Sequence, residues 1–177
     1  NAASFDRDEN INIYSNYSEK LESRYLGYDY SNLEGSEEIY KTLMKNLKKY
    51  EENKLGEMSV IHGDPVFTNI IVRENQELCF IDMRGEVGGK FTIGGDKWYD
   101  YGKILQSLMG YDEILLGKFV EHEYKKNMID LFSHRIETEF GSEKMEHIKL
   151  ISSSLLFSLI PLHGKEKIED YFTLIEL

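Results

Sequence analysis

The sequence predicts a mainly helical α+β domain in which a bundle of helices surrounds a small β-hairpin. Apolar residues recur at helical spacing in the first third and again in the C-terminal half, whereas the middle holds three short β-branched or apolar runs. The chain has 177 residues, of which 41% are hydrophobic, and this is enough for one sizeable core. We therefore expect a single domain over residues 1–177.

The predicted helices follow from apolar spacing and end signals. Ser36 can cap a helix in which Ile39, Leu43 and Leu47 repeat every four residues, and a second, short helix is expected over 18–26. Asp96 is expected to cap the first helix of the C-terminal half. Further helical spacing follows over 114–140, 142–159 and 165–177.

The middle of the chain predicts short strands. Apolar runs over 58–61, 69–72 and 78–82 have strand character, and the polar residues 74–76 form a turn that makes the last two runs a hairpin. The segment 83–95 holds five glycines in thirteen residues, which favours an irregular loop able to approach a ligand.

Composition narrows the function classes. A formal net charge of -11 disfavours binding to nucleic acid or to an anionic membrane. Cys79 is the one cysteine, expected at a buried strand position, which excludes an intramolecular disulfide and points to the cytoplasm. The apolar stretch 150–162 is shorter than the roughly 20 residues of a membrane helix, so we expect a buried helix. Asn1 and Ala2 look like the remnant of an expression tag.

One segment carries the candidate chemistry. It contains His62-Gly-Asp-Pro-Val-Phe-Thr-Asn69, then a strand pair, then Ile81-Asp82. Asp64, Asn69 and Asp82 can converge at the base of the hairpin and supply oxygens to a hard cation such as Mg²⁺, which completes its octahedron with water and phosphate oxygens. Phosphoryl transfer needs such ligands and an Asp that accepts the proton of the attacking hydroxyl.

These residues resemble a known family. His-Gly-Asp, four residues, Asn and, after a hairpin, Ile-Asp are similar to the signature of the aminoglycoside phosphotransferase and choline kinase superfamily, relatives of the protein kinases. The segment that starts Asp96-Lys-Trp-Tyr-Asp100 is similar to a family segment in which an acid opens a helix and a Tyr-Asp pair follows. The resemblance covers roughly residues 58–108 and implies the C-terminal lobe of a protein-kinase-like fold.

The resemblance implies roles for individual residues. Asp64 matches the catalytic base, and Asn69 and Asp82 match the metal ligands, of which Asp82 is the principal one. His62 matches a position that shapes the catalytic loop. Asp100 matches an acid that braces this loop from the helix below, so we expect a largely buried carboxylate bonded near His62, with the neighbouring tyrosines of that helix pointing elsewhere.

Arg84 departs from the family pattern. With Asp82 and Asn69 we include it among the cofactor-binding residues, because an arginine fork can hold a phosphate or a sugar acid through two parallel hydrogen bonds. A salt bridge to a nearby carboxylate is the alternative. Met83-Arg-Gly85 is also similar to kinases associated with enzymes of surface or capsular polysaccharide biosynthesis.

The family has a second lobe that this sequence does not predict. That N-terminal β-lobe covers the ATP phosphates and supplies a lysine, but the residues before the motif are largely of helical character. We therefore expect ATP binding to depend on another lobe or chain.

The predicted function is Mg-ATP-dependent phosphorylation of a hydroxyl on a small molecule, a sugar or an amino alcohol. Three alternatives share the motifs: an antibiotic kinase of the aminoglycoside type, a non-catalytic kinase-like binding module, and a metal-dependent hydrolase. The hydrolase lacks the extra ligands expected of a two-metal site. The acceptor would face the C-terminal helices, where the sequence leaves open whether acids bind a cationic ligand; these acids are Asp112, Glu113, Glu121 and Glu123.

Overall fold

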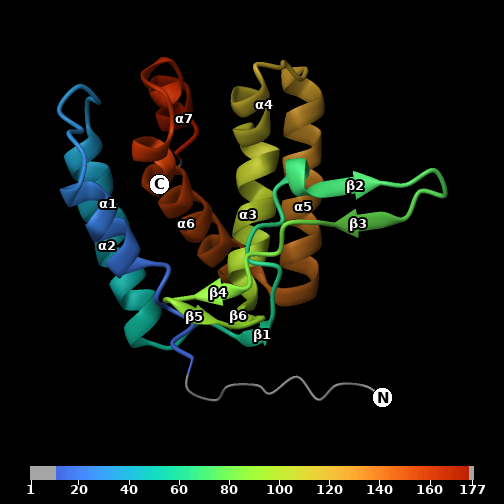
Figure 1. Cartoon of the computed structure of the whole chain (residues 1–177), viewed down its shortest axis with the longest axis horizontal. Coiled ribbons are helices and arrows are strands. Elements are labelled where there is room, and N and C mark those ends of the chain that lie inside the picture. Colours follow the sequence, from blue (N-terminus) through green and yellow to red (C-terminus); the bar gives the residue numbers. More distant parts are fainter. Residues whose placement is uncertain (1–10, 176–177) are drawn as a thin grey trace.

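The computed structural model describes residues 11–175 and confirms a mainly helical α+β fold (Figure 1). Asn1 and Ala2 lie outside this range. The helices are α1 (Ser18–Leu26), α2 (Ser36–Glu52), α3 (Lys97–Met109), α4 (Tyr111–Leu116), α5 (His122–Phe140), α6 (Ser142–Leu159) and α7 (Ile168–Thr173). Helix α1 coincides with the predicted segment 18–26, and the segment 114–140, expected to hold one or two helices, holds all of α5 and the end of α4. Helix α2 contains the predicted apolar repeat, but the expected cap is wrong: Gly35 is the N-cap, and the Ser36 hydroxyl donates to the Tyr30 backbone oxygen at 3.1 Å instead.

Helix α6 is the centre of the core. Figure 1 shows α1 and α2 on one side of it and α3 and α5 on the other, and all four helices pack against it. Ile148, Ile151 and Leu156 of α6 are fully buried, which confirms the buried helix expected here. The segment Ser142–Leu162 is long and apolar enough to cross a membrane, but 67% of its apolar 18-residue window is buried inside the protein, as in a core helix. Gly102 lets α3 approach closely, because a Cβ there would lie 2.7 Å from Ile151 Cγ2.

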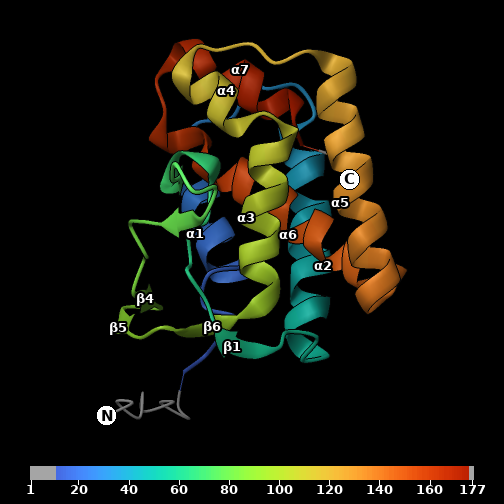
Figure 2. The ribbon, with the colours of Figure 1, turned by 90° about the vertical axis from the view of Figure 1, so that its right-hand side faces the viewer.

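The strands form antiparallel pairs rather than one sheet. Within residues 11–175, β1 (Met58–Val60) pairs with β6 (Gly94–Asp96), β2 (Ile70–Val72) with β3 (Leu78–Phe80), and β4 (Glu86–Val87) with β5 (Lys90–Phe91). Figures 1 and 2 show β1, β4, β5 and β6 together at one end of the helices, whereas Figure 1 shows the β2–β3 hairpin projecting sideways.

The prediction that 83–95 is an irregular loop is wrong. Gly88 and Gly89 have φ angles of 57° and 78°, so these two glycines form a tight turn between β4 and β5. The glycines that predicted an irregular loop therefore form the turn of a hairpin.

The predicted environment of Cys79 is also corrected. Cys79 lies in β3 as expected, but it is only partly buried, and the flanking Leu78 and Phe80 are exposed. The reason is that the β2–β3 hairpin projects away from the helices, and no other element of residues 11–175 covers it (Figure 1).

A single carboxylate fixes the start of α3. Asp96 is buried; its Oδ2 accepts from the hydroxyls of Tyr17 (2.6 Å) and Tyr50 (2.7 Å), and its Oδ1 accepts from the backbone N–H of Glu57 (3.0 Å) and Trp98 (3.2 Å). The last of these bonds is the predicted helix cap. Asp96 thus ties α3 to α2, to the chain before α1 and to the residue before β1.

Candidate functional site

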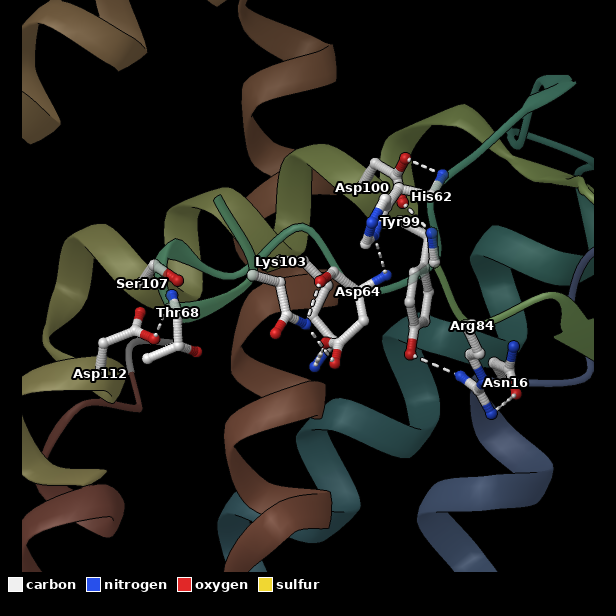
Figure 3. A network of polar contacts seen from close by, with 12 residues as sticks. Asn16, His62, Asp64, Thr68, Arg84, Tyr99, Asp100, Lys103, Ser107 and Asp112 are labelled. Carbon is white, nitrogen blue, oxygen red and sulfur yellow. Dashed lines mark hydrogen bonds and ion pairs between the residues drawn. The ribbon is translucent and has the colours of Figure 1, made fainter. Parts of the chain in front are cut away.

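The loop from His62 to Asn69, between β1 and β2, is bonded to the helix that follows it in sequence. Figure 3 shows Asp100, in the first turn of α3, facing this loop. Its Oδ2 accepts from the His62 backbone N–H at 2.7 Å and its Oδ1 from the Gly63 N–H at 2.8 Å. The contact expected of Asp100 is therefore confirmed, although the side chain is partly rather than fully buried. Burial raises the pKa of Asp100, while its bonds to the two N–H groups oppose the rise.

Two further side chains hold the other end of the loop. Ser107 Oγ accepts from the Phe67 N–H at 3.1 Å, and Asp112 Oδ1 accepts from the Thr68 N–H at 3.1 Å (Figure 3). Sequence reasoning missed Ser107, whose spacing of seven residues from Asp100 places both on one face of α3.

The acids considered as ligands for a cationic acceptor have other surroundings. Asp112 is buried beneath the loop, and Glu113 is paired with Lys125 at 2.8 Å. Glu121 and Glu123 are exposed where α5 begins. Asp112 and Glu113 line a pocket that also includes Phe67 of the loop, whereas Glu121 and Glu123 do not line it.

Asp64 is held from two sides. Its Oδ2 accepts from Asn69 Nδ2 at 3.2 Å, and the same nitrogen donates to the Asp64 backbone oxygen at 2.9 Å. Its Oδ1 lies 2.9 Å from the ammonium nitrogen of Lys103, a residue of α3 that sequence reasoning missed. Each carboxylate oxygen has two lone pairs, so Asp64 can still accept a proton or hydrogen bond from a ligand.

His62 shapes the loop through its ring. Nδ1 of His62 accepts from the Asp64 backbone N–H at 3.2 Å, so the proton of the neutral ring is on Nε2. This bond connects His62 to the residue expected to act as base, which fits the predicted loop-shaping position.

The segment after β3 lies against the loop. The Ile81 N–H donates to the Asn69 oxygen at 3.0 Å and the Arg84 N–H to the His62 oxygen at 2.9 Å, so Asp82 is bracketed by two bonds to the loop. Asp82 is exposed and has a φ of 56°. The backbone thus brings Asp82 next to the loop, and convergence of its carboxylate with Asp64 and Asn69 in one cleft stays a prediction.

The side-chain oxygens of Asn69 and Asp82 are suitable ligands for a hard cation. Because Asn69 turns its nitrogen toward Asp64, its Oδ1 is left to bind another group, and the Asp82 carboxylate is accessible to solvent. Among residues 11–175 no three His, Cys, Asp or Glu side chains gather as a metal-binding group. Two oxygen ligands nevertheless suffice for Mg²⁺ that keeps water and phosphate oxygens in its other positions.

Arg84 contacts neutral groups. Its Nη1 donates to the Tyr99 hydroxyl at 3.0 Å and its Nη2 to Asn16 Oδ1 at 3.2 Å (Figure 3). No carboxylate of the described residues 11–175 lies within 4 Å of this guanidinium, so the predicted alternative of a salt bridge is not found there. The expectation that Tyr99 points away from the site is wrong, because its hydroxyl reaches Arg84.

Tyr99 lies in a positive environment. Burial opposes ionisation of its phenol, but the charges of Lys20, Lys103 and Arg84 together lower the pKa of Tyr99 below its ordinary value. Burial also lowers the pKa of Lys20, and the positive charges of Arg84 and Lys103 lower it further, against the effect of Tyr99. Three cations therefore act on one buried phenol, and one of these cations, Lys103, also contacts the candidate base Asp64.

Comparison with known proteins gives no match to any family model, curated protein or solved structure. Function is therefore inferred from the residues and geometry of the site itself.

We expect Asp100→Ala to lower the free energy of unfolding by about 1–3 kcal/mol, because two partly buried N–H groups lose their acceptor. Denaturant unfolding measures the change. Asp130→Ala, which removes an exposed acid from α5, is the matched control and should change stability by less than about 0.5 kcal/mol. Equal stability of the two variants would contradict the bracing role of Asp100.

We expect Tyr99 to be the first tyrosine to ionise as the pH rises, since three cations favour its phenolate. Because its folded pKa is lowered, Tyr99 adds stability as the pH rises through that pKa, and this gain is absent at lower pH. Absorbance titration at the tyrosinate band measures the step, which Tyr99→Phe should remove. Tyr40→Phe is the control: burial raises the pKa of Tyr40, so its loss should leave the first step intact.

Proposed function

We propose that this chain is the C-terminal, catalytic lobe of a protein-kinase-like small-molecule kinase, which transfers the γ-phosphoryl group of Mg-ATP to a hydroxyl. The observation that carries the proposal is that the Asp100 carboxylate accepts hydrogen bonds from the His62 and Gly63 N–H groups. In the same loop, the Asn69 side chain donates a hydrogen bond to the Asp64 carboxylate. These contacts join two of the three sequence segments that carry the family resemblance, and the bond from the Ile81 N–H to the Asn69 backbone oxygen joins the third. They support an arrangement in which a loop presents one acid to a substrate.

In this proposal Asp64 is the catalytic base. It orients the acceptor hydroxyl and takes its proton while the hydroxyl oxygen bonds to the γ-phosphorus and the bond from that phosphorus to the β-phosphate oxygen breaks. Lys103 and Asn69 each contact one oxygen of Asp64 and so fix the direction of the carboxylate. A fixed carboxylate favours catalysis, because less motion must be restricted when the acceptor binds.

Asn69 and Asp82 would hold Mg²⁺, which when bound neutralises charge on the transferred phosphates. The bonds that bracket Asp82 and the free Oδ1 of Asn69 support this assignment. Both elements described before β1, α1 and α2, are helices. We therefore propose that the loop and lysine covering the ATP phosphates come from another lobe or chain, and that the reaction takes place in the cytoplasm.

The acceptor is proposed to be a small hydroxyl compound used in cell-surface carbohydrate metabolism. The support for this class of acceptor is the similarity of Met83-Arg-Gly85 to kinases associated with enzymes of surface polysaccharide biosynthesis. An antibiotic kinase would use the same loop. Of the four acids considered for a cationic acceptor, however, Asp112 is bonded to the loop backbone, Glu113 is paired with Lys125, and the other two lie where α5 begins.

Asp64 and Asp82 are expected to fail differently when changed, in a complex that includes the ATP-covering lobe. Asp64→Asn should keep Mg-ATP binding and lower turnover by roughly 10²–10⁴-fold, which is the usual contribution of a positioned base. Asp82→Asn should also weaken metal-dependent nucleotide binding. Calorimetric titration with Mg-ATP and a phosphate-transfer assay on sugar and amino-alcohol acceptors measure the two effects.

Asp130→Asn, which changes an exposed acid of α5, serves as the control and should match the unchanged protein in both assays. Normal turnover by Asp64→Asn would show that the base is assigned wrongly. Unaltered nucleotide binding by Asp82→Asn would show the same for the metal ligand.

A further inference from the structure

A group of cations lies around Tyr99, and one of them contacts the proposed base. Lys20 comes from α1, Arg84 from the segment after β3 and Lys103 from α3. Arg84 Nη1 donates to the Tyr99 hydroxyl at 3.0 Å, and the charges of the two lysines favour the Tyr99 phenolate. Figure 3 shows Tyr99 between Asp64 and Arg84. The whole chain carries a formal net charge of -11, so this positive group is a local reversal of the sign of the protein.

Among the described residues 11–175, two of these cations have no acidic partner within ion-pair distance. Lys103 is paired with Asp64 at 2.9 Å. For Lys20 and Arg84, no carboxylate of residues 11–175 lies within 4 Å. Like charges brought together and partly removed from water repel one another, which is unfavourable unless an anion joins them. The arrangement therefore suits a bound anion.

Arg84 is placed to bind such an anion. Its side chain is exposed, and its two terminal nitrogens now donate to the neutral oxygens of Tyr99 and Asn16. A phosphate or carboxylate can replace these neutral acceptors with stronger, charge-assisted bonds, and an arginine fork matches either group in two-bond geometry.

We propose that Lys20, Arg84 and Tyr99 bind an anionic group, a phosphate or a carboxylate, on the acceptor whose hydroxyl faces Asp64. The acceptor class is then a phosphorylated sugar or a sugar acid, rather than an aminoglycoside or another cationic amine. Assignment of the anion to the acceptor rests on the phosphotransfer proposed above. Within that proposal, the contact between Lys103 and Asp64 places the cations close to the point where the acceptor hydroxyl must react.

The test measures binding to the chain without nucleotide. Calorimetric titration uses inorganic phosphate, glucose 6-phosphate and glucuronate as anionic probes, and glucose and glucosamine as neutral and cationic ones. Saturable binding of the anionic probes is expected. Lys20→Met and Arg84→Gln should each weaken it by about tenfold or more, because each removes charge-assisted hydrogen bonds.

Matched variants separate charge from folding. Arg24→Gln removes a positive charge from α1 one helical turn after Lys20, where it acts on Tyr30 instead, and should leave binding unchanged. Lys20→Arg keeps the charge and should retain binding, so it remains informative if Lys20→Met unfolds. Loss of binding in Arg24→Gln to the same extent as in Lys20→Met would overturn the site.

Other outcomes also decide the question. No saturable binding of any anionic probe, or preferred binding of glucosamine, overturns the proposal. If Lys20→Met and Arg84→Gln weaken Mg-ATP but not the anionic probes, the cations serve the nucleotide and the acceptor assignment is wrong. Because these titrations need no turnover, a protein that binds the probes but transfers no phosphate in the complex with the ATP-covering lobe would overturn the proposed function and leave the anion site standing.

Discussion

Four hydrogen bonds on one buried carboxylate determine where α3 begins, and α3 supplies most of the groups that hold the site. Asp96 accepts from two tyrosine hydroxyls and two backbone N–H groups. A buried carboxylate is stable only when its oxygens are well supplied with donors, so the two tyrosines and the residue before β1 must lie where they do. The start of α3 is thereby fixed relative to β1, from which the loop departs.

Helix α3 has two faces with separate tasks. Gly102 faces α6 and permits close packing, whereas Asp100, Lys103 and Ser107 project from the other face toward the loop. A rigid helix packed on a buried core holds side chains more accurately than a loop can hold its own. The eight residues from His62 to Asn69 are therefore shaped mainly by contacts from outside the loop.

Sequence patterns predicted what depends on local chemistry. The α1 and α2 segments, the cap at Asp96 and the bond from Asp100 to the loop follow from spacing and side-chain type within short stretches. The β4–β5 hairpin was missed, because glycines that permit a two-residue turn also permit an irregular loop.

The missed site residues have a different cause. Lys20 and Tyr99 meet across 79 positions of sequence, and an amphipathic helix pattern does not say which distant side chain a lysine will face. Lys103 was open to prediction, because it lies three residues after Asp100 on the same helical face. The direction of Arg84 depends on Asn16, a residue before α1 that carries no motif.

The contacts of α3 with the loop also limit how the two segments can change in length. The spacing of Asp100, Lys103 and Ser107 along α3 must match the spacing of their partners, because each contacts a different residue of one loop. One residue inserted between Asp100 and Ser107 would rotate Ser107 by about 100° around the helix axis and shift it along the axis by about 1.5 Å. Loop and helix therefore tolerate insertions or deletions only as a coordinated pair, and substitutions elsewhere on the exposed surface are free of this restriction.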